Sequence, residues 1–91
     1  MAKFKKMVWF EGRVQGVGFR YKARQIAAAY EVAGYVKNLD DGRVELCAVG
    51  EESEVEEYVA ALKECMADFI KNVKILDGET ELKYKGFNIE L

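Results

Sequence analysis

The sequence predicts an α+β sandwich of two layers, with two helices on one face of a mainly antiparallel sheet. Three observations support this prediction. Segments with a two-residue apolar period flank segments in which apolar residues recur every three or four positions. An Asp-Gly pair at residues 41–42 indicates a hairpin between two strands. The length of 91 residues suits one domain with one modest core, so residues 1–91 are expected to fold as a single unit.

The first strand and the first helix lie in the first third of the chain. Lys3–Glu11 is rich in aromatic and β-branched residues and is predicted to be a strand with Phe4, Val8 and Phe10 on one face. After it the period becomes helical, and Gly34 is expected to end the helix. The apolar residues that recur at three- and four-residue steps along this helix are Phe19, Ala23, Ile26, Ala27 and Tyr30.

The middle of the chain predicts an antiparallel pair. Tyr35–Asn38 and Arg43–Val49 have strand composition, and residues 39–42 between them form a Leu-Asp-Asp-Gly turn. Glycine accepts the positive φ that such a turn requires at little cost. These two strands are therefore expected to be neighbours in the sheet.

The second helix and the last strands complete the pattern. Ser53 and Glu56 have the spacing of a capping box, and helical periodicity follows them as far as Met66. Asn72–Leu76 and Tyr84–Leu91 are predicted strands, with a turn over residues 77–80. Residues 67–73 fit no single element, and their path is left open.

The resulting β-α-β-β-α-β order is that of a ferredoxin-like sandwich with four or five strands. In the split β-α-β arrangement, strands one and two run parallel with strand three between them. Their carboxyl ends then share one edge of the sheet, about 10 Å apart across two strand spacings. The loop that follows Glu11 and the residue Asn38 are therefore expected to lie side by side.

Composition excludes several classes of function. The formal net charge is −2, and basic residues alternate with acidic ones, so no broad surface for nucleic acid or an anionic membrane is expected. No run of 18 apolar residues and no signal-peptide core occurs, which favours a soluble cytoplasmic protein. The protein is also expected to be a monomer. The chain has no histidine and two cysteines, Cys47 and Cys65, which excludes tetrahedral zinc sites. Both cysteines are expected to be buried free thiols.

The glycine-rich segment over residues 12–20 joins the first strand to the first helix. Its backbone N–H groups can turn inward at a helix N-terminus, where the helix dipole also favours an anion. Arg20 adds a planar charge that can hold two phosphate oxygens. Spacing alone favours a structural interpretation, a tight strand-to-helix turn with a surface arginine. Neither the nucleotide P-loop pattern nor the dinucleotide pattern is present, since no Gly-Lys-Ser/Thr ending occurs and Tyr21 replaces the third glycine.

Two longer motifs resemble the signatures of the acylphosphatase family. Residues 12–20, Gly-Arg-Val-Gln-Gly-Val-Gly-Phe-Arg, are similar to the first signature. The second is matched by Gly34-Tyr35-Val36-Lys37-Asn38, followed by Gly42, Val44 and Gly50. The two motifs cover residues 12–50 in the correct order, and the family fold is the sandwich inferred above from periodicity.

The resemblance implies hydrolysis of a small-molecule acyl phosphate without a metal or cofactor. The phosphoryl group would be held by the guanidinium of Arg20 and by the loop formed by Gln15, Gly16, Val17, Gly18, Phe19 and Arg20. The side chain of Asn38 would position the attacking water. Without the resemblance, the favoured interpretation of Asn38 is a hairpin-end residue that bonds its own backbone.

The alternative function is a non-catalytic module that binds phosphate or nucleic acid. An RNA-binding sandwich would carry stacking aromatic residues on its third strand, and Arg43–Val49 has none. A domain of a larger enzyme of carbamoyl-phosphate chemistry is a further alternative. The chain ends where the domain ends, which favours a stand-alone enzyme.

Overall fold

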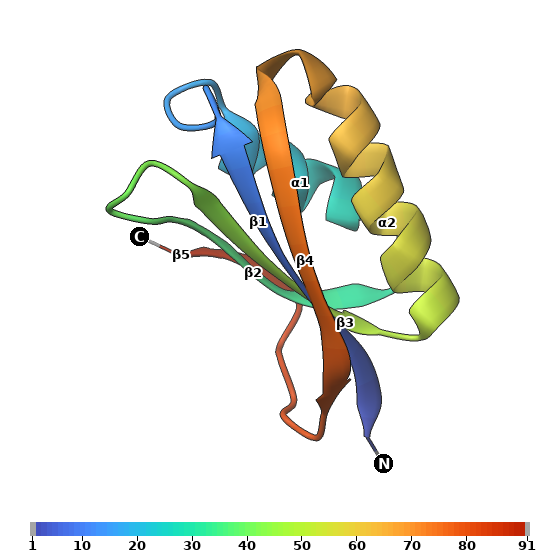
Figure 1. Ribbon diagram of the computed structural model, residues 1–91. Coiled ribbons are helices and arrows are strands. Elements are labelled where there is room, and N and C mark those ends of the chain that lie inside the picture. Colours follow the sequence, from blue (N-terminus) through green and yellow to red (C-terminus); the bar gives the residue numbers. More distant parts are fainter. Residues whose placement is uncertain (1, 91) are drawn as a thin grey trace.

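The computed structural model describes residues 2–90 and has the predicted two-layer architecture (Figure 1). Both helices cover one face of a five-stranded sheet with the order β4-β1-β3-β2-β5. The β2–β5 pair is parallel and the other pairs are antiparallel. The elements are β1 (Lys3–Gly12), α1 (Phe19–Ala27), β2 (Val32–Asn38), β3 (Val44–Gly50), α2 (Glu52–Cys65), the short 3₁₀ helix η1 (Ala67–Phe69), β4 (Ile70–Thr80) and β5 (Phe87–Glu90). The ferredoxin-like prediction is confirmed.

The position of β3 between β1 and β2 brings distant parts of the sequence together. Both neighbours pair antiparallel with β3, so β1 and β2 run in the same direction. Phe10 and Asn38 both pair with Val44 at the same level of the sheet. The loop after β1 therefore lies beside the end of β2, as the topology predicted.

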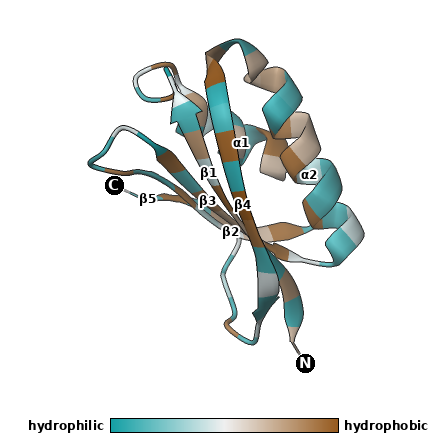
Figure 2. Cartoon of the chain, in the orientation of Figure 1, coloured by the Kyte–Doolittle hydropathy of each residue, from teal (hydrophilic) through white to brown (hydrophobic). Residues whose placement is uncertain are grey.

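The core fills the space between the sheet and the two helices. Figure 2 shows hydrophobic segments along the sheet and on the side of α2 that faces it. Tyr58 of α2 is fully buried, and its hydroxyl donates a hydrogen bond to the carbonyl of Ala23 in α1 at 2.8 Å. Each buried large side chain contributes about 1.5–3 kcal/mol. The largest fully buried side chains of the described residues are Val8, Phe10, Val14, Phe19, Val36, Val44, Leu46, Cys47, Val55, Tyr58 and Leu62.

Gly34 does not end the first helix, contrary to the sequence prediction. Helix α1 ends at Ala27, and Gly34 lies within β2 with φ 134°. A Cβ atom at Gly34 would lie 1.9 Å from the carbonyl oxygen of Cys47 on β3. Glycine is required here because the two backbones approach too closely for any side chain.

The predicted capping box of the second helix is also wrong. Helix α2 begins at Glu52 with Glu51 as its N-cap, so Ser53 lies inside the first turn, and no side chain caps the helix. Glu52 and Glu54 are in the first turn, where their negative charges interact favourably with the helix dipole. Glu56 instead forms an ion pair with Lys6 of β1 at 2.7 Å.

The predicted turn over residues 77–80 is part of a long edge strand. Strand β4 continues to Thr80 because the first half of β1 pairs with it, with Gly78 opposite Lys5 and Thr80 opposite Lys3. Residues 67–69 form the 3₁₀ helix η1, which settles the path that the sequence left open. Strand β5 begins at Phe87, three residues after the predicted start at Tyr84, and the predicted last residue, 91, lies outside the described residues.

The two cysteines differ in exposure. Both are free thiols, but Cys47 is buried in β3 whereas Cys65 is exposed at the end of α2, so the prediction of burial is wrong for Cys65. Helical periodicity placed Cys65 at the margin of the apolar face of the helix. In the structure Cys65 is the last residue of α2, and its side chain is exposed to solvent. In residues 2–90, no helix has the length and apolar character needed to cross a membrane.

Candidate active site

The loop after β1 and the end of β2 enclose a small cleft of about 220 Å³. This volume is below the ~300–1,000 Å³ of clefts that take drug-sized ligands, so it suits a compact ligand. In Figure 1 this loop lies beside the β2–β3 hairpin, at the opposite end of the sheet from the N-terminus. The cleft is lined by Val14, Gly16, Gly18, Phe19, Arg20, Tyr21 and Asn38.

In the part of the chain that the structure describes, the start of α1 leaves backbone N–H groups without acceptors. Gly18 is the N-cap of α1 and has the left-handed conformation, with φ 78° and ψ 19°. Gly16 has the same φ. The first intrahelical donor is the N–H of Lys22, which bonds the carbonyl of Gly18. Over residues 2–90, the N–H groups of residues 15–20 donate to no backbone or side-chain acceptor, so they remain available to an anion.

Two buried side chains hold this loop against the core. Val14 has no exposed surface, and Phe19 is 2% exposed. The ring of Phe19 packs against Phe10 of β1 with centroids 4.8 Å apart. Because Phe19 is the first residue of α1, this packing fixes the helix start and therefore the position of Arg20.

Arg20 is half-buried and reaches the edge strand β5. Its Nη1 donates a hydrogen bond to the carbonyl of Glu90 at 3.3 Å. This acceptor is an uncharged backbone carbonyl, and within residues 2–90 no carboxylate forms an ion pair with Arg20. The hydrogen bond to Glu90 thus orients the guanidinium without neutralising its charge, and the remaining N–H donors of Arg20 can bind an anion.

Asn38 is the last residue of β2 and lines the same cleft. Its side chain is half-buried, and in the described part of the chain no hydrogen bond ties its amide to the hairpin backbone. The amide can therefore bind a ligand or a water molecule in the cleft.

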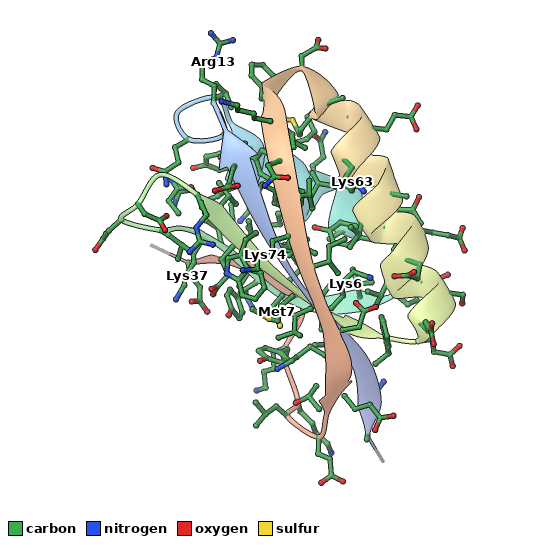
Figure 3. The ribbon with its side chains drawn as sticks, in the orientation of Figure 1. Lys6, Met7, Arg13, Lys37, Lys63 and Lys74 are labelled. Atoms are coloured by element: carbon green, nitrogen blue, oxygen red, sulfur yellow. The ribbon has the colours of Figure 1, made fainter. Side chains whose placement is uncertain are left out.

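The other arginine of the loop is turned away from the cleft. The guanidinium of Arg13 lies over the ring of Phe69, 5.5 Å from its centroid, and Figure 3 shows it projecting outward from the loop. The N–H of Arg13 also bonds the carbonyl of Phe69 at 2.9 Å. Arg13 therefore anchors the start of the loop to η1.

The structure brings together most of the site residues proposed from the sequence. Gly16, Gly18, Phe19, Arg20 and Asn38 line the cleft. Val17 packs against the core, and the side chain of Gln15 binds the hairpin, so neither side chain lines the cleft. Sequence reasoning missed Val14 and Tyr21. Val14 could have been found because it is an apolar residue inside a glycine-rich loop. Tyr21 could have been found because it follows Arg20 in the first helical turn.

Two larger hollows of about 360 Å³ lie at the opposite end of the sheet. One is lined by Lys3, Glu51 and Glu52 among others, and the other by Lys3, Glu81 and Lys83 among others. Neither contains Arg20, Asn38 or the glycine-rich loop, so the smaller cleft is the better candidate for a phosphate site.

Comparison with known proteins identifies the family. Residues 6–89 match the model of the acylphosphatase family. The chain belongs to this family of hydrolases. The acylphosphatase of Listeria welshimeri is 45% identical over 91 residues, covering 98% of each chain. That of Archaeoglobus fulgidus is 40% identical over 83 residues, covering 90% of this chain and 92% of its own.

A solved structure supports the same assignment. The crystal structure of acylphosphatase from Bacillus subtilis superposes with a TM-score of 0.86 at 32% identity, covering 97% of this chain and 99% of that one. The family and the full-length relatives are enzymes, which favours a hydrolase over the non-catalytic binding module considered from the sequence.

Proposed function

We propose that this acylphosphatase-family chain hydrolyses acyl phosphates to a carboxylate and inorganic phosphate through the cleft between the β1–α1 loop and Asn38. One observation carries the proposal: Arg20, Asn38 and loop residues whose N–H groups have no acceptor within residues 2–90 all line one small cleft. The family acts on small acyl phosphates, and the cleft volume of about 220 Å³ is suited to ligands of that size.

The phosphoryl group would be held by charge and backbone dipoles together. The N–H groups of residues 15–20 bind its oxygens at the positive end of α1, and Arg20 donates two parallel hydrogen bonds to two of them. The carbonyl of Glu90 holds the guanidinium in place before substrate arrives. Such preorganised donors stabilise the charge on the equatorial oxygens in the transition state.

Asn38 would orient the water that attacks phosphorus. As the new P–O bond forms, the bond between phosphorus and the acyl oxygen breaks, and its electron pair leaves with the carboxylate. A carboxylate is a good leaving group, so no general acid is required. Because an amide cannot accept a proton at neutral pH, a phosphoryl oxygen of the substrate takes the proton from water.

The test is phosphate release from benzoyl phosphate by the purified protein in the presence of EDTA. Wild type is compared with Arg20→Gln. Arg13→Gln is the matched control, because the Arg13 side chain points away from the cleft and the variant keeps the backbone hydrogen bond to Phe69 that anchors the loop. We expect release that survives EDTA, falls by about 10²- to 10³-fold in Arg20→Gln and persists in Arg13→Gln. A folded wild type that releases no phosphate would contradict the proposed function. Equal activity in Arg20→Gln would remove this residue from the mechanism.

A further inference from the structure

Tyr21 is an exposed aromatic side chain on the wall of the candidate active site. It follows Arg20 in the first turn of α1 and lines the same cleft as Asn38. Of its surface, 67% is exposed. The other apolar side chains of the wall, Val14 and Phe19, are buried in the core. Tyr21 therefore offers the accessible apolar surface at this cleft.

Arg24 restrains the ring of Tyr21. It lies three residues further along α1, on the same side of the helix. Its guanidinium carbon is 5.7 Å from the centroid of the Tyr21 ring, within the range of a cation–π contact. In residues 2–90 no carboxylate forms an ion pair with Arg24. The contact with Arg24 thus restricts the rotation of the exposed Tyr21 ring. Because the ring is already restricted, it loses less conformational entropy when a ligand packs on it.

The geometry of phosphoryl transfer indicates which part of the substrate would lie near Tyr21. In an in-line displacement the leaving group lies opposite the attacking water. With the phosphoryl group in the cradle and water at Asn38, the acyl group projects away from Asn38. Tyr21 and Asn38 belong to different elements, α1 and β2, on the rim of the same cleft. Among the residues that line the cleft, Tyr21 carries the exposed apolar side chain that an acyl group on that side could contact.

We propose that Tyr21, positioned by Arg24, forms the acyl-group subsite and favours acyl phosphates with an aromatic or bulky apolar acyl group over acetyl phosphate. This inference rests on the proposed function. An acyl group that packs on the Tyr21 ring gains from the burial of apolar area and, when it is aromatic, from ring–ring contact. The subsite therefore selects for apolar area and shape. The contribution of one such aromatic contact corresponds to about a 3- to 10-fold preference.

The experiment compares kcat/KM for benzoyl phosphate and acetyl phosphate in wild type, Tyr21→Ala and Tyr21→Phe. Gln25→Ala is the matched control, since Gln25 is exposed on the same helix and does not line the cleft. We expect Tyr21→Ala to lower kcat/KM for benzoyl phosphate by about 3- to 10-fold, mainly through KM, while acetyl phosphate changes by less than about twofold. Tyr21→Phe and Gln25→Ala should keep the wild-type ratio. Arg24→Gln should reduce the ratio by about half the effect of Tyr21→Ala.

Inhibition by inorganic phosphate distinguishes a subsite from a disturbed cradle. Its inhibition constant should be the same in wild type and Tyr21→Ala, because Tyr21 is assigned to the acyl group alone. An unchanged substrate ratio in Tyr21→Ala, or an equal loss for both substrates, would overturn the subsite while leaving the proposed function in place. A wild type that hydrolyses neither substrate would overturn both.

Discussion

The side-chain amide of Gln15 donates a hydrogen bond to the carbonyl of Leu39 at 2.8 Å and so ties the β1–α1 loop to the residue after Asn38. The same nitrogen donates to the carbonyl of Arg43 at 2.9 Å. Leu39 and Arg43 close the β2–β3 hairpin through a backbone hydrogen bond of their own. One side chain therefore links the phosphate cradle to the strand end that carries the proposed water-binding residue.

This link predicts that Gln15→Met lowers turnover although the side chain does not line the cleft. Methionine has a similar length but no donor, so two hydrogen bonds are lost and the loop can shift relative to Asn38. Small displacements of positioned groups cost up to ~10²-fold in rate, and we expect a 10- to 10²-fold fall in kcat. Steady-state kinetics on benzoyl phosphate measures it.

Gln15→Glu provides the sharper comparison at the same position. A carboxylate accepts hydrogen bonds and cannot donate to the two carbonyls, and its charge would also repel the phosphoryl group. Its kcat/KM should fall further than that of Gln15→Met. Wild-type kinetics in either variant would show that the link to the hairpin has no role in catalysis.

Asn38→Ala is expected to lower kcat by about 10²- to 10³-fold with little change in KM, because the water is oriented only during the reaction. Asn38→Asp should also raise KM, since its carboxylate faces the phosphoryl group. The matched control is Asn72→Ala on β4, whose amide bonds Glu11 outside the cleft. Circular dichroism checks that each variant is folded. A normal kcat in Asn38→Ala would contradict the assigned role.

Gly34→Ala is expected to destabilise the protein by at least ~3 kcal/mol or to prevent folding. The added Cβ would lie 1.9 Å from the carbonyl oxygen of Cys47, which belongs to the backbone of β3 and cannot rotate away. Gly78→Ala on the edge strand β4 is the control, because a Cβ at Gly78 meets nothing within 4 Å. Urea denaturation of both variants gives the free energies of unfolding. Similar stabilities for the two variants would contradict the argument from close approach.

Periodicity in the sequence was sufficient to predict the two layers and the edge of the sheet at which Arg20 and Asn38 line one cleft. Periodicity gave the wrong local structure where contacts with distant segments of the chain determine it. Asp77 and Gly78 have turn chemistry, yet they lie in β4 because β1 continues beside them and pairs with them. Gly34 reads as a helix stop, but its role is set by a carbonyl on a neighbouring strand.

In the candidate active site, too, local features were predictable and contacts between distant segments were not. Glycine spacing and the arginine predicted an anion cradle, because backbone donors at a helix start are a local property. The contact of Gln15 with the hairpin and the position of Tyr21 on the cleft wall depend on how two distant segments dock. No periodic pattern in one sequence encodes such contacts.

Lys6 joins three elements through an ion triad in which the lysine is nearly buried. Its Nζ lies 2.7 Å from Glu56 of α2 and 2.7 Å from Asp77 of β4, and the lysine side chain is 7% exposed. Figure 3 shows this side chain between the sheet and α2. Burial by itself would lower the pKa of the Lys6 ammonium group, but hydrogen bonds to Asp77 and Glu56 and the charges of both carboxylates raise this pKa above its ordinary value.

This arrangement predicts that Lys6→Met destabilises the protein at neutral pH and that the difference disappears in alkali. Both carboxylates are about half exposed, so the loss should lie between that of surface and buried pairs, about 1–2 kcal/mol. A raised pKa means that the folded state holds the proton more tightly, so this stability is complete below the unfolded pKa of ~10.4. It is lost as the pH rises through the higher folded value. The difference between the two proteins should therefore be constant from pH 7 to about 9.5 and shrink above about 10.5.

The measurement is urea denaturation of wild type and Lys6→Met across this pH range. Burial and the hydrogen bond to Glu45 also raise the pKa of Tyr35, so both proteins should lose stability in alkali as this phenol ionises on unfolding. Because the phenol is common to both, subtracting the two free energies of unfolding isolates Lys6. A difference that stays constant beyond pH 11, or that grows with pH, would show that the triad does not favour the charged lysine in the folded state.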